Sequence, residues 1–327
     1  MINFGTLGAA RITPPALIDP CQNDDRASVA LVAARSKQRA EAFAKEHNIP
    51  TALDGYDEVI ASNRITAIYN PLPINHHHEW TIKALRAGKH VLCEKSFASN
   101  AREAEEMLAV ANETKLVLMD AFHYRYHPIF LKAKEIYDSG ILGKIKSISS
   151  TFSVPVVDTN DIRMNYETAG GVTMDIGCYP LSWVRHITGL EPVSVEAVAE
   201  VGPANVDIYL ETKMLFPGGI DVRTIGDMRP NTKFKAVITV EGEQGVMIVK
   251  NPIAPQAGNA IDLDMNGEIT TETFRRRPTY RYQLDAFIDA VTEGKTLFTD
   301  AEDAVKQMQL IDKCYQAAGL PLRGLTL

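Results

Sequence analysis

The sequence has little that points to a membrane, a nucleic acid or a secretory pathway. Its 34 lysines and arginines are outnumbered by 41 aspartates and glutamates, and the formal net charge of −7 argues against nucleic acid or an anionic membrane as the main partner. No apolar run approaches the ~18 residues that span a bilayer. The N-terminal segment lacks the basic and apolar regions of a signal peptide. We therefore expect a cytoplasmic protein that binds neither membrane nor nucleic acid.

The sequence also lacks a cysteine framework. The cysteines are scattered and form no Cys-x-x-Cys pair, which predicts reduced thiols rather than disulfides or a zinc site. They are Cys21, Cys93, Cys178 and Cys314. The run His76-His77-His78 does not supply a metal site, because successive residues at a helix start do not converge on one ion. No metal is predicted.

The first third of the chain alternates short apolar segments with helical patterns. Nearly continuous apolar strands separated by helices indicate βαβ units and a parallel sheet covered on both faces. The expected strands are Ile2–Leu7, Val29–Ala34, Ala67–Asn70, His90–Cys93 and Leu116–Ala121, and the expected helices are Ser36–His47, His76–Ala87 and Asn100–Asn112. At 327 residues the chain is long enough for two domains, and the first is expected over residues 1–121.

The pattern changes after residue 121. Residues 205–216 alternate apolar and polar side chains, a turn follows at residues 217–219, and the alternation resumes from Ile220. Phe234–Val240 and Val246–Val249 then flank a hairpin loop. This predicts an antiparallel sheet with one covered face in a second domain, residues 122–327. The helices expected after the sheet are Tyr280–Thr292 and Ala301–Ala317.

A degenerate dinucleotide fingerprint follows the first strand. In such a fingerprint, small residues let the backbone approach the pyrophosphate at a helix N-terminus. Gly8 fills the first glycine position, but Ala10 stands at the second and Thr13 at the third. Arg11 and Ile12 lie between them. A plain strand-to-helix turn of small residues would look similar, so this turn alone does not decide between the two.

The end of the second strand bears on the choice of cofactor. An NAD-selective site places Asp or Glu there to accept hydrogen bonds from the ribose. This chain has Arg35 instead, followed by Ser36 and Arg39. Two guanidinium groups and a hydroxyl suit a 2′-phosphate, which favours NADP(H), with NAD(H) also possible. The alternative is a solvated basic helix start.

The segment HVLCEKSFASN, residues 90–100, places Glu94 and Lys95 directly after an apolar strand. Ligands of an open parallel sheet bind beyond the carboxyl ends of its strands, so we expect both residues beside the nicotinamide crevice. A lysine there donates to an alkoxide-like oxygen and favours the deprotonated form of a neighbouring acid. The alternative is a surface lysine at the end of a strand.

The second domain contains a candidate acid/base. Asp175 and Tyr179 stand four residues apart at the start of a helical pattern, and this spacing puts two side chains on one helix face. A tyrosine near a positive lysine and a helix N-terminus exchanges a proton more readily than a free phenol. The alternative for Tyr179 is an ordinary core tyrosine.

Together these motifs resemble the Gfo/Idh/MocA oxidoreductases, and most of all the branch with dihydrodiol dehydrogenases, NADP-dependent xylose dehydrogenases and keto-sugar reductases. The markers are Val32–Arg35, Tyr69–Pro73, Ala87–Lys95, Ala121–Pro128, Asn160–Arg163 and Gly170–Pro180. The resemblance spans the whole chain. It implies an α/β protein, a Rossmann domain followed by an α/β domain with a large, mostly antiparallel open sheet. Such proteins form dimers or higher oligomers, so we expect a homodimer or tetramer associating through that sheet.

The resemblance also implies roles for single residues. Tyr179 is the acid/base that exchanges the proton of the substrate hydroxyl, Lys95 assists it, and Asp175 completes the catalytic set. The residues implied at the cofactor are Gly8, Ala10, Arg11, Ile12, Arg35, Ser36, Arg39, Asn70, Pro71, Leu72, His76, Glu94 and Lys95. His123, Arg163 and Trp183 are candidates for the substrate pocket.

The expected reaction is NADP(H)-dependent hydride transfer between nicotinamide and a carbinol or carbonyl carbon of a sugar or related polyhydroxy compound. The alternatives are a trans-dihydrodiol dehydrogenase that acts on aromatic diols and a non-catalytic NADP(H)-binding sensor. The sensor is suggested by Ser96, which stands where the family usually has proline and relaxes the backbone restriction on Lys95. The intact Asp175 and Tyr179 argue for an enzyme.

Overall fold

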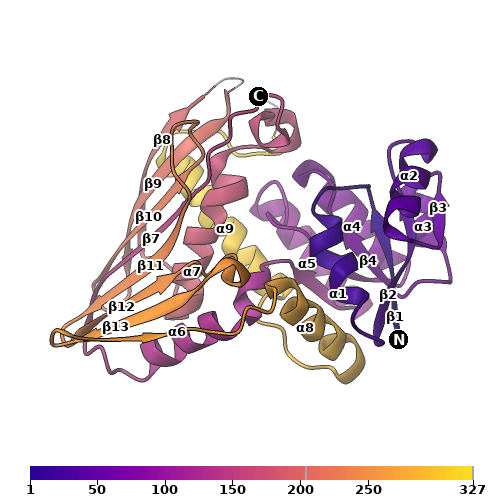
Figure 1. Cartoon of the computed structure of the whole chain (residues 1–327). Helices are drawn as coiled ribbons and strands as arrows, with labels where there is room; N and C mark the ends of the chain where they lie inside the picture. Colours follow the sequence, from indigo (N-terminus) through magenta and orange to yellow (C-terminus); the bar gives the residue numbers. More distant parts are fainter. Residues whose placement is uncertain (203–204, 326–327) are drawn as a thin grey trace. The chain divides into compact units, whose positions relative to one another are not determined.

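The computed structural model describes residues 1–202 and 205–325 and divides into two compact units (Figure 1). One unit contains Met1–His123 and Tyr280–Lys306, and the other contains Tyr124–Thr279 and Gln307–Leu327. The boundary expected after residue 121 lies near the first change of unit. The sequence did not indicate that residues 280–306 return to the first unit.

The first unit is built on a six-stranded sheet in the order β3-β2-β1-β4-β5-β6, with every pairing parallel. The strands are β1 (Ile2–Leu7), β2 (Ala27–Ala33), β3 (Thr51–Leu53), β4 (Ala67–Asn70), β5 (His90–Cys93) and β6 (Leu118–Asp120). This is the doubly wound order, in which the direction of winding reverses between β1 and β4. Every residue of β4 and β6 is buried, which requires cover on both faces of the sheet. The predicted parallel sheet is confirmed.

Helices connect these strands. They are α1 (Asp19–Cys21), α2 (Lys37–His47), α3 (Tyr56–Ala61), α4 (His77–Arg86) and α5 (Ala101–Thr114), with a π-helical segment at Pro14–Ile18 before α1. The helix α8 (Thr279–Glu293) comes much later in the chain and connects no strands of this sheet, but from Tyr280 onward it belongs to this unit. The starts of α2 and α5 follow from the sequence, because the side chains of Ser36 and Asn100 accept hydrogen bonds from the backbone N–H of Arg39 and Glu103. The longer α9 (Ala301–Ala317) begins in the first unit and continues into the second.

The second unit is built on an eight-stranded sheet in the order β14-β13-β12-β11-β7-β10-β9-β8. The strands are β7 (Ile145–Ser153), β8 (Ser194–Val201), β9 (Asp207–Phe216), β10 (Ile220–Asp227), β11 (Lys235–Gly242), β12 (Gly245–Lys250), β13 (Ala260–Met265) and β14 (Glu268–Glu272). Only β7 and β10 pair in parallel, so the sheet is mostly antiparallel, as the resemblance implied.

Helices cover one face of this sheet. Figure 1 shows α6 (Pro128–Asp138), α7 (Cys178–Thr188) and the later part of α9 on that face, and the opposite face carries no helix in the part of the chain that the structure describes. The strands follow this asymmetry, since buried and more exposed residues alternate along β9 and β10. Every residue of α7 is buried, which makes this helix the centre of the core on the covered face.

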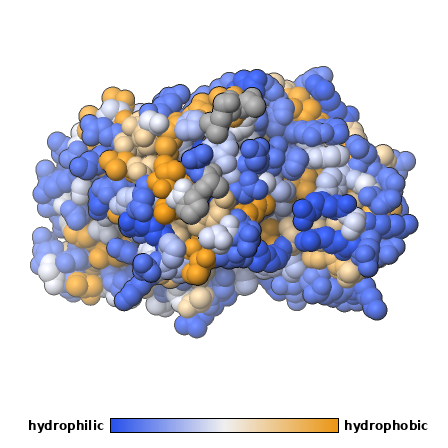
Figure 2. All heavy atoms as spheres, turned by 90° about the horizontal axis from the view of Figure 1, so that it is seen from above, coloured by the Kyte–Doolittle hydropathy of each residue, from blue (hydrophilic) through white to orange (hydrophobic). Residues whose placement is uncertain are grey.

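The hydropathy of the surface and the length of the helices bear on membrane insertion. The face shown in Figure 2 is mainly hydrophilic, with apolar residues in small scattered groups. Within residues 1–202 and 205–325, no helix is long and apolar enough to cross a membrane.

Candidate active site

The turn after β1 has the geometry of a nucleotide-binding turn. Gly8 has a φ of +98°, and a Cβ added there would lie 3.3 Å from Cδ2 of Leu72, so glycine suits this position for both reasons. The backbone N–H of Gly8 donates to the carbonyl of Ala33 at 2.7 Å, which fixes the turn at the end of β2. Because Leu72 follows β4, the turn lies at the reversal point of the sheet, where such sheets bind ligands.

Two arginines stand beside this turn without a carboxylate partner. Arg35, Ser36 and Arg39 are all exposed. A guanidinium N–H of Arg39 donates to the carbonyl of Ala9 at 3.1 Å, so its side chain lies against the turn. No carboxylate in the described residues forms an ion pair with either arginine. Both act electrostatically on Tyr56, since their charges oppose the rise in the pKa of Tyr56 that its burial causes.

These residues fit a nicotinamide dinucleotide. The turn offers backbone close approach at Gly8, and two exposed cations follow β2 where an NAD-selective site would have a carboxylate. Unpaired guanidinium groups suit a phosphate, which they bind in bidentate geometry. Of the other residues predicted at this turn, Ala10 and Ile12 are half-buried and Arg11 is exposed.

The backbone of Lys95 and Ser96 is held by a buried histidine. His77 is 1% exposed, and its Nδ1 and Nε2 lie 2.9 Å and 2.7 Å from the carbonyl oxygens of Ser96 and Leu72. Burial lowers the pKa of His77 to about 4, and the charge of Lys95 acts in the same direction. The Lys95–Ser96 peptide bond is cis. Although the usual proline is absent, His77 anchors this segment to the loop after β4.

Sequence reasoning placed His76, not His77, near the cofactor. The structure exposes His76 and buries His77, so the anchoring residue was missed. Helical periodicity could have found it, because His77 and Thr81 share the buried face of α4. The side-chain amide of Asn70 donates to the His77 carbonyl at 3.3 Å and to Thr81 Oγ1 at 3.2 Å, and Pro71 is buried after it. The predicted Asn70–Leu72 segment is therefore rigidly held.

Two buried carboxyl groups lie near Lys95. Glu94 is 8% exposed and accepts a hydrogen bond from the Tyr69 hydroxyl at 2.7 Å. Asp120, at the end of β6, is 1% exposed. Burial, together with the charges of Asp303 and Glu94, raises the pKa of Asp120 well above its ordinary value, whereas Lys95 opposes the rise. The sequence analysis missed Asp120. This residue is the last of β6, and Glu94 directly follows the neighbouring strand β5, so both stand at the carboxyl end of a strand.

In the second unit, Arg163 joins two of the predicted residues. Its Nε donates to a carboxylate oxygen of Asp175, and its Nη1 lies 3.1 Å from Oδ2 of Asp161. The charge of Asp175 raises the pKa of Arg163, and Tyr179 adds to the rise. The guanidinium therefore lies within electrostatic reach of the Tyr179 phenol. The predicted substrate candidate Arg163 thus lies in one cluster with Asp175 and Tyr179.

The segment that carries Asp175 and Tyr179 is helical but not uniformly α-helical. Asp175 lies in a π-helical segment, Thr173–Gly177, and Tyr179 follows in α7. Close approach allows this arrangement, because a Cβ on Gly226 of β10 would lie 2.7 Å from Cα of Gly177. The spacing of Asp175 and Tyr179 is therefore not that of one α-helical turn, which the sequence argument assumed.

Side chains from other elements hold the start of α7. Ser150 of β7 donates to the Pro180 carbonyl at 3.1 Å, and Gln307 of α9 donates to the Cys178 carbonyl at 3.0 Å. Buried backbone carbonyl groups require hydrogen-bond donors, and these two side chains supply them from neighbouring elements. The start of α7 is therefore fixed to both the sheet and the C-terminal helix.

Aromatic rings surround Tyr179, which is 5% exposed. The Phe152 ring stands edge-on to it with centroids 5.4 Å apart, and the Trp183 ring lies 6.3 Å away. Trp183 is fully buried, so it packs within this cluster rather than facing solvent. His123, the third pocket candidate, is 4% exposed, stacks on Tyr280 with centroids 4.2 Å apart, and belongs to the first unit.

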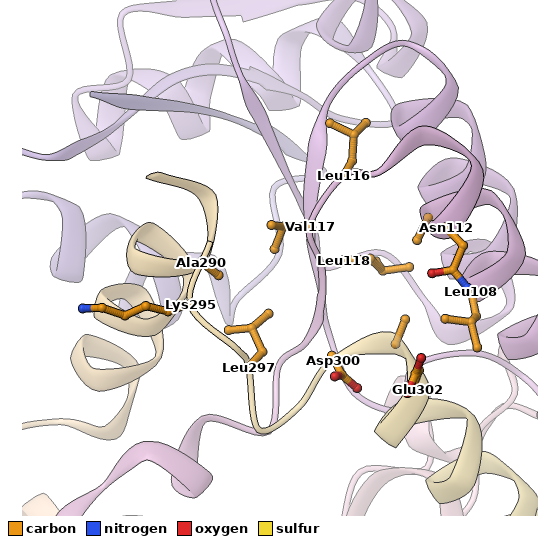
Figure 3. A pocket seen from close by; sticks show the side chains of 12 residues that line it. Leu108, Asn112, Leu116, Val117, Leu118, Ala290, Lys295, Leu297, Asp300 and Glu302 are labelled. Atoms are coloured by element: carbon orange, nitrogen blue, oxygen red, sulfur yellow. The ribbon is translucent and has the colours of Figure 1, made fainter. Parts of the chain in front are cut away.

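A separate hollow of about 210 Å³ lies elsewhere in the first unit (Figure 3). Its apolar lining comes from α5, β6, α8 and the loop before α9, and Lys295 points away from it. It contains none of the predicted site residues. No three His, Cys, Asp or Glu side chains in the described ranges are grouped to hold a metal ion.

The chain matches known proteins along most of its length. The profile described as "Oxidoreductase family, NAD-binding Rossmann fold" matches residues 2–122, and that of the "GFO/IDH/MocA C-terminal domain" matches residues 130–248. A relative named D-xylose 1-dehydrogenase (NADP(+)) 2, from Haloferax volcanii, is 33% identical over 320 residues, 96% of this chain and 97% of that protein. The chain belongs to the GFO/IDH/MocA family.

Solved structures agree with this assignment. A 3-ketoreductase from Actinomadura kijaniata in complex with NADP and TDP-benzene has a TM-score of 0.90 and 26% identity, with 97% of each chain covered. Structures of the same enzyme also exist with one lysine replaced by alanine or one tyrosine by phenylalanine. A trans-1,2-dihydrobenzene-1,2-diol dehydrogenase from Xenopus tropicalis is 31% identical over 191 residues, 58% of each chain.

The class of protein follows. The chain is an NAD(P)-dependent oxidoreductase that acts on CH–OH groups. The predicted family, enzyme class and nicotinamide cofactor are confirmed. The family assignment favours an enzyme over the non-catalytic sensor.

Proposed function

We propose that the chain transfers a hydride between NADP(H) and a carbinol or carbonyl carbon of a sugar or related polyhydroxy compound, with Tyr179 as acid/base and Lys95 as its assistant. The observation that carries the proposal is the guanidinium of Arg163, bound to Asp175 and within electrostatic reach of the Tyr179 phenol. The bound cofactor supplies or accepts the hydride. The side chains described here bind the reactants and move the proton.

The proton steps are assigned to Tyr179. In reduction, the carbonyl oxygen gains negative charge and takes the proton of the Tyr179 hydroxyl, and in oxidation the tyrosinate takes the proton from the substrate hydroxyl. A nearby positive charge stabilises the phenolate, so Arg163 favours the form that remains after proton donation. A positioned acid/base contributes about 10²–10⁴-fold to such reactions.

Lys95 is proposed to donate to the developing alkoxide, which a preorganised cation stabilises. Its backbone is anchored through His77, and Glu94 beside it is held by Tyr69. A comparison supports the pairing with Tyr179. The lysine and the tyrosine replaced in the Actinomadura ketoreductase structures are separated by the same number of residues as Lys95 and Tyr179.

The cofactor assignment rests on the turn after β1 and the end of β2. We propose that Gly8–Ile12 meets the pyrophosphate, that Arg35, Ser36 and Arg39 bind the 2′-phosphate, and that Asn70–Leu72 with His76 lines the nicotinamide half. Exposure and the lack of a carboxylate partner support the arginine assignment. The cofactor domain is then the predicted residues 1–121 together with the returning residues 280–306, and the rest of the predicted second domain is the substrate and subunit domain.

The test begins with titration of the purified protein with NADPH and NADH, followed by fluorescence. We expect preferential NADPH binding, and oxidation of NADPH when keto-sugars are supplied or reduction of NADP⁺ with aldoses. Equal affinity for both cofactors would withdraw the 2′-phosphate assignment. NADPH binding without turnover on any sugar or diol would contradict the proposed reaction.

A second candidate substrate is an aromatic trans-dihydrodiol. The ring of Phe152 lies edge-on to Tyr179 and also to Phe234, which is 58% exposed, so aromatic surface adjoins the acid/base. The Xenopus relative carries the name of that activity. The Arg163–Asp175 ion pair instead favours hydroxyl-rich substrates. A higher kcat/KM for trans-dihydrodiols than for sugars would favour the diol, and Phe234→Ala would then lower it selectively.

We also propose a homodimer or tetramer formed through the open face of the eight-stranded sheet. Val198 and Leu215 are 70% and 40% exposed, on adjacent strands β8 and β9. Val198 pairs with Glu211, which faces the same side as Leu215. Light scattering on the purified protein tests the assembly, and Leu215→Glu should dissociate it. A monomer at micromolar concentration would contradict it.

A further inference from the structure

A buried ion pair lies behind the acid/base segment of the second unit. Arg323 Nη2 is 2.5 Å from Asp207 Oδ1, and the two side chains are 1% and 0% exposed. Taking both charges out of water is costly, so such a pair persists only when further hydrogen bonds satisfy its remaining atoms. The partners of the two side chains show what the pair does.

The second carboxylate oxygen of Asp207 holds the beginning of the helical segment. Oδ2 accepts hydrogen bonds from the backbone N–H of Thr173 at 2.8 Å and from its hydroxyl at 2.6 Å. Thr173 is the first residue of the π-helical segment that contains Asp175. Asp207, from β9, therefore caps this segment with a negative charge at its N-terminus.

Arg323 holds the residues just before that start. Its Nε donates to the Gly170 carbonyl at 2.8 Å. Its guanidinium lies over the rings of Tyr166 and Tyr315, 4.5 Å and 4.6 Å from their centroids. One side chain thus neutralises Asp207 and ties the glycine pair Gly170–Gly171 to the C-terminal part of the chain.

The glycine pair leaves room for this contact. Gly171 has a φ of +135°, and a Cβ there would lie 2.1 Å from Oδ1 of Asp207. A Cβ on Gly170 would lie 2.6 Å from the carbonyl oxygen of Arg163. Both positions must be glycine for the carboxylate to reach Thr173 and for the chain to pass the backbone of Arg163.

We propose that Asp207 and Arg323 are positioning residues that set the direction of the Thr173–Thr188 helical run and thereby the place of the Tyr179 hydroxyl. The inference rests on the proposed role of Tyr179. The pair acts through Thr173 and Gly170 and does not touch the reactants. A displacement of the acid/base lowers kcat far more than cofactor affinity, because correct placement contributes to the chemical step.

The decisive variant is Thr173→Val. It keeps the shape of the side chain and removes only the hydroxyl that donates a hydrogen bond to Asp207. We expect kcat to fall by about tenfold or more while the KM for NADPH is unchanged, and Thr173→Ser to restore kcat. Arg323→Met leaves Asp207 buried without its partner and should lower Tm by on the order of 10 °C. If it fails to fold, Thr173→Val still gives the answer.

Two controls separate positioning from general stability. Thr212→Val removes a buried hydroxyl contact to Thr224 at 2.7 Å in the same unit, and it should lower Tm without changing kcat. The second control uses the only two tryptophans, Trp80 and Trp183. In a Trp80→Phe background, emission reports on Trp183 in the Tyr179 cluster. Thr173→Val should change that emission and Thr212→Val should not.

The outcomes distinguish this inference from the proposed reaction. Wild-type kcat and unchanged Trp183 emission in folded Thr173→Val, with Tyr179→Phe inactive, would overturn the positioning role and leave the reaction standing. An active Tyr179→Phe would remove the proposed acid/base, and Trp183 emission would still decide whether the pair sets the position of α7. Equal losses of kcat in Thr173→Val and Thr212→Val would also overturn the positioning role.

Discussion

Two arginines of the first unit and two of the second differ in their partners. In the first unit, Arg35 and Arg39 are exposed and form no ion pair with any described carboxylate. In the second, Arg163 is paired with Asp175 and Asp161, and Arg323 is buried against Asp207. The same side chain is thus exposed and without a described carboxylate partner at the end of β2, and held in ion pairs at Arg163 and Arg323.

The difference shows which property of the protein each kind of arginine affects. An unpaired guanidinium keeps its hydrogen-bonding capacity for a phosphate, and its contribution appears as ligand affinity. A paired and buried guanidinium has already given up its hydration, and its contribution appears as a defined position of its neighbours. Substitutions of Arg35 and Arg39 should therefore change binding, and those of Arg163 and Arg323 should change turnover.

The largest expected effect is that of Tyr179→Phe, which removes only the proposed acid/base hydroxyl. We expect kcat to fall by about 10²–10⁴-fold with NADPH affinity unchanged. Steady-state kinetics and NADPH titration check both parts. A loss of NADPH affinity in this variant would contradict the expectation that Tyr179 affects turnover and not cofactor binding.

The double variant Arg35→Ala, Arg39→Ala should lower NADPH affinity by about 10²-fold and leave NADH affinity unchanged, since each lost charged hydrogen bond contributes about 1.5–3 kcal/mol at most. Fluorescence titration with both cofactors measures it. Arg102→Ala, at an exposed arginine on α5, is the matched control and should affect neither cofactor. Equal losses for NADPH and NADH would place the arginines away from the 2′-phosphate.

His77 is a residue of the first unit that, like Arg323 in the second, is buried and holds the backbone of its neighbours. Its effect on stability should therefore depend on pH. Burial lowers the pKa of His77 to about 4 in the folded state, against about 6.5 for an exposed histidine. As the pH falls, His77 is therefore protonated in the unfolded chain before it is protonated in the folded chain. The contribution of neutral His77 to the free energy of unfolding is complete above about pH 6.5 and is lost as the pH falls toward about 4. Between pH 7.5 and pH 5 this loss amounts to about 2 kcal/mol.

Denaturant unfolding at the two pH values measures the effect. His77→Asn does not titrate in this range, so its stability should depend less on pH by that amount. Equal pH dependence in the wild type and in His77→Asn would show that His77 has the same pKa in the folded and unfolded chains, and would contradict the lowered pKa. A wild type that gains stability relative to His77→Asn as the pH falls would show that His77 is charged in the folded state, with both ring nitrogens donating to the carbonyls of Ser96 and Leu72.

The smallest expected effect is that of Arg163→Gln, which removes the positive charge near Tyr179. We expect kcat to fall by about tenfold and the pH at which activity titrates to move upward by about one unit, because the phenolate is no longer favoured. Profiles of kcat against pH provide the measurement. Arg163→Lys keeps the charge and should retain most of the wild-type profile.

The sequence predicted the elements whose burial pattern is strong. The bounds of β1, β4, β5 and α9 agree with the expected ranges. Weakly patterned elements were missed. The strand β3 has three half-buried residues, and β14 is exposed at every residue, so neither has an apolar alternation to detect. They form because neighbouring strands offer hydrogen-bonding edges, which a local pattern does not reveal.

For the site, the sequence predicted the candidate functional residues at the ends of helices and strands. It did not predict the residues whose hydrogen bonds and ion pairs fix the position of those segments. Lys95, Asp175 and Tyr179 were identified, whereas Asp207 and Arg323 were not. Asp207 stands at the start of a strand whose alternation was recognised, with no sign that its carboxylate caps a segment from another part of the chain. Partners distant in sequence require the fold itself.

The ion pair of Asp207 and Arg323 also bears on the order of folding. The contacts of Arg323 with Gly170 and Asp207 span 153 and 116 residues, whereas the contact of Arg39 with the turn at Ala9 spans 30. Contacts between distant residues form late, because a long loop must close first. A refolding chain should therefore form the contact of Arg39 with the turn at Ala9 before the pair of Asp207 and Arg323, and stopped-flow refolding should show turnover returning only in the later phase in which this pair forms.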